Sequence, residues 1–225
     1  MIRHISLLLC VIMFLTISKV CAQPPESKLL EGKGTDTAVI LAHGREGDPD
    51  SKVVGPLRKT INTELNFHTL SLQMPVLPGE KFKEYARVFP DAYKTISDAI
   101  NFLTKEKGVK RIYLMGYSMG ARMTSAFLAK QPHPAIIGYI GIGMLTGGGA
   151  PLNANWNIKK VEVPVIDIYA TETPLDRKSA KKRQKLVSDT YKQVRIDGAE
   201  HSFSGYDSQI AQAVIAWLKQ QEKNQ

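Results

Sequence analysis

The sequence predicts an α/β fold of three layers, with a mostly parallel central sheet of about six strands and helices on both faces. Short apolar runs are continuous rather than alternating, which is typical of strands that are buried on both faces. Segments with helical spacing separate these runs, as the crossover connections of a parallel sheet require. The 225 residues contain no internal repeat and no long linker, so residues 23–225 are expected to form a single domain.

Six short segments have the apolar character of buried strands. They cover residues 37–43, 67–74, 109–115, 135–144, 163–170 and 191–196. Five further segments are expected to be helices. They cover residues 56–65, 91–108, 119–131, 177–190 and 206–221. In the second of these, Asp91 is the expected cap and Gly108 the expected stop.

Residues 1–22 differ from the rest of the chain. Arg3 and His4 precede an apolar run at residues 5–17, and the small Ala22 follows. This pattern predicts a secretory signal peptide cut before Gln23, with an uncleaved membrane anchor as the alternative. After cleavage no stable membrane span is expected, and the protein would be periplasmic or secreted. Cys10 and Cys21 both lie in this segment, so the mature chain would have neither disulfides nor a catalytic thiol.

The chain is basic, with 30 Lys and Arg residues against 21 Asp and Glu residues. Much of the excess lies in "DRKSAKKRQK", residues 176–185. The favoured interpretation is the solvated face of a helix. A nucleic-acid partner is not expected, because no aromatic residues interleave with these lysines to stack on bases. The charge would still attract anionic substrates over a distance.

Ser118 lies between two glycines in "GYSMG", directly after a strand-like run and directly before a helix-like one. A strand that turns into a helix within so few residues needs small neighbours, and Gly116 and Gly120 meet that need. The turn would project the Ser118 side chain clear of the backbone. The amide of Met119 would lie at the helix N-terminus, where it can donate to a developing oxyanion.

This stretch resembles the nucleophile elbow of the α/β-hydrolase superfamily, and the order of strands and helices is similar to that fold. The resemblance implies a serine nucleophile at Ser118 and a histidine base in the loop after the last strand, where His201 lies. His43 and Gly44 resemble the superfamily's His-Gly turn, which makes the amide of Arg45 the second oxyanion donor and His43 a structural residue. The region after residue 144 is short, so a large lid domain is not expected. The segment before residue 37 has room for one extra edge strand of the sheet.

The acidic partner of His201 is expected after the strand at residues 163–170. The superfamily often shows Gly-x-x-Asp there, but this chain reads "ATETPLD", with Thr173 in place of the aspartate. Glu172 lies one residue early with a longer side chain, and Asp176 lies three residues late. Glu172 is slightly preferred, Asp176 is the other candidate, and the absence of any such carboxylate stays open.

The sequence therefore predicts an exported serine hydrolase that cleaves an acyl ester or thioester of a small molecule or polymer without a cofactor or a metal. An acyltransferase or peptidase would use the same atoms. The phrases "AHGREGDPDSKVVGPLRK" and "VPVIDIYATE" resemble an exported bacterial family of this fold whose members are uncharacterised. The alternative is a non-catalytic binding protein of the cell envelope that retains the fold. Residues 75–90 and 145–151 are expected to wall the pocket, and oligomeric state is not predicted.

Overall fold

The computed structural model describes residues 21–224, so most of the predicted signal peptide lies outside the described residues. Seven strands within this range form one sheet in the order β1-β3-β2-β4-β5-β6-β7. The strands are β1 (Lys28–Leu30), β2 (Thr37–Ala42), β3 (His68–Leu72), β4 (Arg111–Tyr117), β5 (Ile136–Ile142), β6 (Val165–Ala170) and β7 (Tyr191–Ile196). The six predicted strands are all present and parallel, and β1 adds an antiparallel edge strand beside β3.

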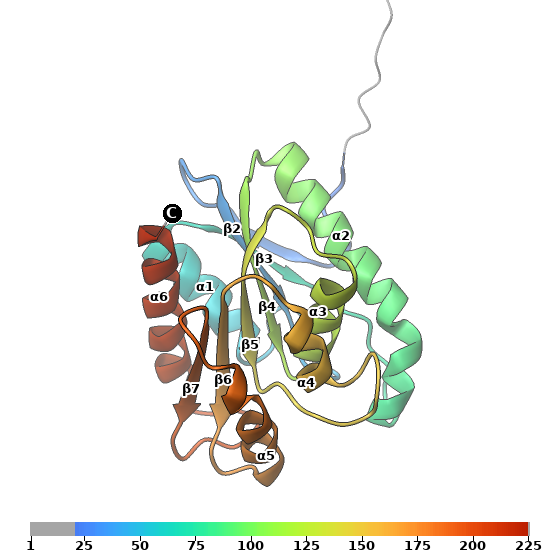
Figure 1. The fold of residues 1–225 in the computed structure, drawn as a ribbon. Helices are drawn as coiled ribbons and strands as arrows, with labels where there is room; N and C mark the ends of the chain where they lie inside the picture. The colour runs from blue at the N-terminus through green and yellow to red at the C-terminus, as the bar shows by residue number, and fades with distance from the viewer. Residues whose placement is uncertain (1–20, 225) are drawn as a thin grey trace, which may run out of the picture.

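Helices cover both faces of the sheet, as predicted (Figure 1). The α-helices are α1 (Val54–Leu65), α2 (Phe89–Glu106), α3 (Met119–Lys130), α4 (Ala154–Asn157), α5 (Pro174–Arg183) and α6 (Asp207–Lys223). Three short 3-10 helices are η1 (Phe82–Val88), η2 (Ile158–Lys160) and η3 (Gln184–Leu186). Figure 1 shows α1 and α6 against one face, and α2, α3 and α4 against the other. Within residues 21–224, none of the helices is both long and apolar enough to cross a bilayer.

Three helices begin earlier than the sequence indicated, and α1 does so by two residues, at Val54 rather than at residue 56. We expected Asp91 to cap α2, but α2 begins at Phe89 with Pro90 in its first turn. Likewise α5 begins at Pro174 rather than at residue 177. Proline suits the first turn of a helix because its fixed φ is already helical and its missing N–H would have no partner there. The earlier start of α5 carries Asp176 into the first turn of that helix.

The core is divided by the sheet into two apolar clusters. Along β2, Ala38 and Ile40 pack in the cluster that includes α2 and α3, whereas Val39 and Leu41 pack in the cluster that includes α1 and α6. Every residue of β2 is buried, which explains why this strand reads as a continuous apolar run. Because β2, β4, β6 and β7 are parallel, their carboxyl ends lie at one edge of the sheet. The loops that follow them meet there.

A single arginine holds the glycine-rich loop that follows β5. Arg122, on α3, is almost fully buried and donates to the carbonyls of Thr146 at 3.2 Å, Gly147 at 3.0 Å and Leu152. The Phe82 ring lies 5.4 Å from the Arg122 guanidinium carbon. Burial lowers the pKa of Arg122 to about 10, which still leaves the guanidinium charged at neutral pH. The loop is thereby fastened to the helix that begins at Met119.

Candidate active site

Ser118 forms a sharp turn between β4 and α3. Its φ of 54° and ψ of −109° lie in a region that L residues rarely adopt. The turn is possible because the residues two positions before and two positions after Ser118 are glycines. A Cβ on Gly120 would come 2.3 Å from the carbonyl oxygen of Ala42, and one on Gly116 would come 2.3 Å from Thr124 Oγ1. The two glycines of "GYSMG" are therefore required by close packing, and Ser118 stands at the edge of the sheet.

The structure brings Ser118, His201 and Asp176 into one hydrogen-bonded chain. Ser118 Oγ lies 2.8 Å from His201 Nε2, and His201 Nδ1 lies 2.9 and 3.0 Å from the two carboxylate oxygens of Asp176. Because a carboxylate only accepts, Nδ1 carries the proton and Nε2 is free to accept from the serine hydroxyl. Asp176 is 1% exposed. This is the order of groups that a nucleophile, its base and an orienting acid need.

The sequence slightly favoured Glu172 over Asp176 as the acidic partner of His201, but the structure places Asp176 against the histidine. Glu172 is exposed, and its carboxylate accepts a hydrogen bond from the Thr171 hydroxyl at 3.2 Å. The earlier start of α5 is the physical reason for the difference. It carries the Asp176 side chain inward on the first turn, whereas Glu172 remains in the exposed loop before the helix.

Residues from three different segments hold His201 in place. Thr173, which occupies the position of the superfamily's aspartate, accepts the His201 backbone N–H at 2.8 Å through its hydroxyl. Tyr117 donates its hydroxyl to the His201 carbonyl at 3.0 Å, and the two rings stack with centroids 6.0 Å apart. Burial, followed by the charge of Asp176, raises the pKa of Tyr117 to about 12, so its hydroxyl stays a donor. Gly143 packs closely against the His201 ring, because a Cβ at this position would come 3.1 Å from His201 Cε1.

A cavity of about 540 Å³ opens over Ser118. Its lining residues are Gly44, Arg45, Glu46, Gly47, Ser51, Lys52, Tyr117, Ser118, His201 and Ser202. Residues 75–90 and 145–151 do not contribute to this lining, contrary to expectation, because the loop between β2 and α1 forms the wall. Arg45 lies in that loop, and the amide of Met119 is among the first-turn amides that have no partner within α3. The two predicted oxyanion donors thus belong to segments that border the cavity.

His43 is buried behind this wall and has a structural role. Its Nδ1 lies 2.7 Å from the Gly44 carbonyl, and its Nε2 accepts the backbone N–H of Met74 at 3.0 Å. The first contact requires a proton on Nδ1 and the second requires none on Nε2, so the ring is neutral. Burial lowers the pKa of His43 below its usual 6.5, although the Gly44 carbonyl opposes this shift. The residue joins the loop after β2 to the segment after β3.

We expect His43 to make the fold sensitive to mild acid. Because the pKa of His43 is lowered in the folded chain, the unfolded chain takes up this proton first as the pH falls. The free energy of unfolding should therefore decrease below about pH 6.5, by up to about 1.4 kcal/mol per pH unit from this group. Urea denaturation at a series of pH values measures this slope. His43→Gln should flatten it and the partly exposed His133→Gln should not, so equal slopes in all three proteins would contradict the expectation.

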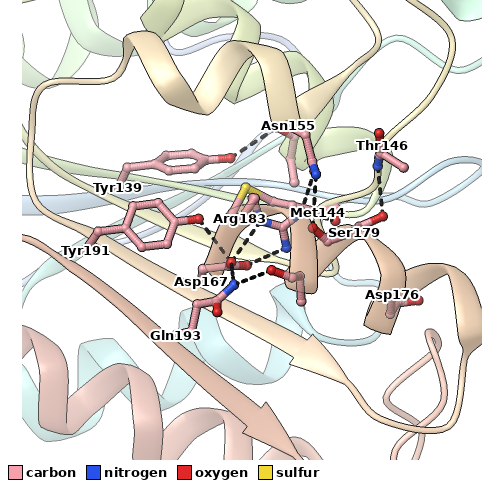
Figure 2. A network of polar contacts seen from close by, with 12 residues as sticks. Tyr139, Met144, Thr146, Asn155, Asp167, Asp176, Ser179, Arg183, Tyr191 and Gln193 are labelled. Atoms are coloured by element: carbon pink, nitrogen blue, oxygen red, sulfur yellow. Dashed lines mark hydrogen bonds and ion pairs between the residues drawn. The ribbon is translucent and has the colours of Figure 1, made fainter. Parts of the chain in front are cut away.

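A buried polar network anchors α5 beneath the site (Figure 2). Arg183, which is 1% exposed, donates from Nε and Nη2 to the two carboxylate oxygens of Asp167 on β6, both at 2.8 Å. Its Nη1 donates to the Met144 carbonyl at 2.8 Å and to Asn155 Oδ1 at 2.6 Å. Arg183 lies on the same buried helix face as Asp176, two turns further on. One guanidinium thus ties the helix that carries Asp176 to β6, to the end of β5 and to α4.

Arg183→Met is expected to lower the free energy of unfolding by about 3–5 kcal/mol. The variant leaves Asp167 buried without its cation, although Tyr191 and Gln193 still donate to that carboxylate at 3.0 and 2.8 Å. Urea denaturation would measure the loss. Arg177→Met on the exposed face of α5 is the matched control, because Arg177 donates to a single carbonyl, that of Thr171, and should cost less than about 1 kcal/mol. Similar losses in both variants would refute a special role for the network.

Comparison with solved structures identifies the fold. Est1E from Butyrivibrio proteoclasticus superposes with a TM-score of 0.70 at 15% identity, covering 88% of this chain and 94% of that one. An alpha-beta serine hydrolase homologue from Coxiella burnetii superposes with a TM-score of 0.69 at 16% sequence identity, covering 88% of this chain and 95% of that one. Dienelactone hydrolase from Anabaena variabilis ATCC 29413 superposes with a TM-score of 0.69 at 18% sequence identity, covering 86% of this chain and 90% of that one. The fold is therefore that of the α/β hydrolases, as the resemblance implied.

At the level of sequence, a search of curated proteins found no match. A family described as a protein of unknown function, DUF3530, matches residues 91–220. This range extends from α2 to α6 and includes Ser118, Asp176 and His201. It is also more than half of the chain. The protein therefore belongs to the DUF3530 family.

Proposed function

We propose that this protein is a serine hydrolase that cleaves carboxylic acyl esters. The observation that carries the proposal is the chain of contacts from Ser118 Oγ through His201 to the buried Asp176 carboxylate. A serine hydroxyl alone does not attack esters at neutral pH, and the histidine beside it supplies the base. A buried carboxylate on the far side of the ring stabilises the imidazolium that forms.

In the proposed reaction Ser118 Oγ bonds to the acyl carbon while its proton passes to His201 Nε2. The amides of Met119 and Arg45 donate to the oxyanion, and His201 then returns the proton to the leaving alcohol. A water molecule, deprotonated by His201 Nε2, attacks the carbonyl carbon of the resulting acyl-Ser118 ester. The bond from this carbon to Ser118 Oγ breaks, His201 returns the proton to Ser118 Oγ, and the acid is released. This two-step route needs no cofactor. A thioester would follow the same steps with a thiol as the leaving group.

Labelling with a fluorophosphonate tests the proposal directly, because this reagent phosphonylates only activated serines. We expect one label per folded chain, located by mass spectrometry in the tryptic peptide of residues 112–122, which contains Ser118. Hydrolysis of p-nitrophenyl esters of increasing acyl length would then define the substrate class. A folded protein that takes no label, or takes it on another serine, would refute a serine hydrolase at this site.

We also propose that the enzyme acts outside the cytoplasm. This proposal depends on residues 1–22 alone, whose basic start, apolar run and Ala22 are typical of a secretory signal peptide. The mass of the protein recovered from an exporting host should correspond to a chain that begins at Gln23. A chain recovered with residues 1–22 intact would instead support the membrane anchor.

A further inference from the structure

Exposed large apolar side chains are confined to one region of the molecule. Within residues 21–224 they are Trp156 on α4, Leu175 on α5 and Val187 after η3, with exposed fractions of 55%, 43% and 52%. The rest of the described surface has no such side chain. Leu175 and Val187 lie at opposite ends of the segment formed by α5 and η3, and Trp156 lies on α4, which contacts α5. Scattered apolar residues are ordinary on a protein surface, so the meaning of these three depends on the side chains around them.

Lysines surround the exposed tryptophan. A hollow of about 390 Å³ between α4 and α5 is lined by Trp156, by Thr146 and Asn155, and by four lysines, Lys159, Lys181, Lys182 and Lys185. We refer to Trp156 and the four lysines as the basic patch. Trp156 lies 25 positions or more before the lysines of α5 and η3 in the sequence, so only the fold brings the aromatic ring and these charges together. No aromatic residue lies among these lysines in the sequence, but the fold brings one beside them.

The charges of the basic patch are not neutralised by the protein. Within the described part of the chain, no carboxylate lies within 4.0 Å of any of its lysines. The opposite face of α5 is buried and carries Asp176 and Arg183. One face of α5 therefore packs in the core, and the other face is exposed to solvent and carries lysines without an ion-pair partner.

We propose that the basic patch binds the surface of a bilayer that contains anionic phospholipids. Lysine side chains are attracted to such a surface, and tryptophan prefers the level of the lipid headgroups. Leu175 and Val187 favour a bilayer over a nucleic acid or another soluble polyanion, because aliphatic side chains gain nothing from a phosphate chain in water. A single bound phosphate is also disfavoured, because the basic patch offers point charges and no arginine fork. The proposal is independent of any catalytic activity.

Vesicle co-sedimentation tests this proposal with the full chain. The probes are vesicles of phosphatidylcholine alone and vesicles of phosphatidylcholine with phosphatidylglycerol. The readout is the preference for anionic vesicles, compared between the wild-type protein and its variants, because residues 1–22 with their apolar run and Arg3 are the same in all of them. We expect preferential binding to the anionic vesicles that declines with salt. The triple variant Lys181→Gln/Lys182→Gln/Lys185→Gln should lose about fivefold in partitioning for each lysine removed.

A matched triple variant provides the control. Lys83, Lys105 and Lys223 are exposed and lie on other elements, so their replacement by glutamine removes the same charge and should largely preserve the preference for anionic vesicles. Equal losses in the two triple variants would mean that net charge alone acts, and would overturn the proposal. So would an absence of preference in the wild-type protein. Tight binding to a soluble polyanion such as heparin, without binding to anionic vesicles, would overturn it in favour of a soluble partner.

Fluorescence gives a second readout at the basic patch itself. The chain has two tryptophans, and Trp217 is 4% exposed. A shift of emission to shorter wavelength on addition of anionic vesicles should therefore come from Trp156 and disappear in Trp156→Phe. An unchanged emission spectrum in the presence of bound vesicles would show that another surface makes the contact.

Discussion

Replacing Ser118 with alanine is expected to lower kcat for ester hydrolysis by about 10⁶-fold, which leaves the residual catalysis that binding and the oxyanion donors supply. The variant removes the hydroxyl that attacks the acyl carbon in the first step, so no acyl-enzyme can form. Its fold should be unaffected, because the Ser118 hydroxyl contacts His201 and the strained backbone of the turn stays the same. Initial rates with a p-nitrophenyl ester at saturating concentration would measure the loss.

Ser202→Ala is the matched control for this variant. Ser202 lines the same cavity, but its hydroxyl accepts hydrogen bonds from Ser204 rather than contacting His201. Its replacement should change kcat by less than about tenfold. If Ser118→Ala retained most of the activity, or if both variants lost it equally, the hydrolysis would have to come from a different group.

Asp176→Asn is expected to lower kcat by about 10⁴-fold with little change in KM. Asparagine has the shape of aspartate, but it carries no charge to stabilise the imidazolium. Its amide also donates toward His201 Nδ1 and favours the wrong tautomer. The buried position of Asp176 makes the loss severe, since little water can replace the missing charge. Steady-state kinetics, with thermal denaturation to verify folding, would measure both effects.

Glu172→Gln separates the two carboxylates that the sequence left open. Because Glu172 is exposed and contacts Thr171 rather than His201, its replacement should leave kcat within about twofold of the wild type. A large loss in Glu172→Gln together with a small loss in Asp176→Asn would reverse the assignment that the geometry supports.

The fold could be predicted from the sequence because its signals are local. The central strands β2 and β5 are nearly continuous apolar runs, and α2 and α6 each bury apolar residues at helical spacing, so the alternation of elements was evident. The elbow was equally clear, since Gly116 and Gly120 flank Ser118 for steric reasons that act within a few residues. The edge strand β1 has three residues, and its pairing with β3 depends on contacts about forty positions apart along the chain.

The acidic residue was harder to predict because its position depends on where a helix begins. A helix that starts at Pro174 turns Asp176 inward, whereas the basic composition of the segment suggested a start at residue 177. The role of Thr173 was not evident either, because its hydroxyl serves the backbone of His201, 28 residues away. The sequence does not show that Thr173 and His201 are neighbours, because they come together only through the pairing of β6 with β7.

The attachment of the glycine-rich loop to Arg122 has a consequence for the dynamics of the protein. Gly147, Gly148 and Gly149 all have positive φ, and three successive glycines would ordinarily form one of the most mobile segments of a chain. Arg122 donates to carbonyls on both sides of this run, so the loop cannot open without uncovering a buried guanidinium. In terms of native-state hydrogen exchange, the loop and the N-terminal part of α3, which carries Arg122, should therefore open as one cooperative unit. A segment that resembles a flexible linker in sequence should be protected like a helix.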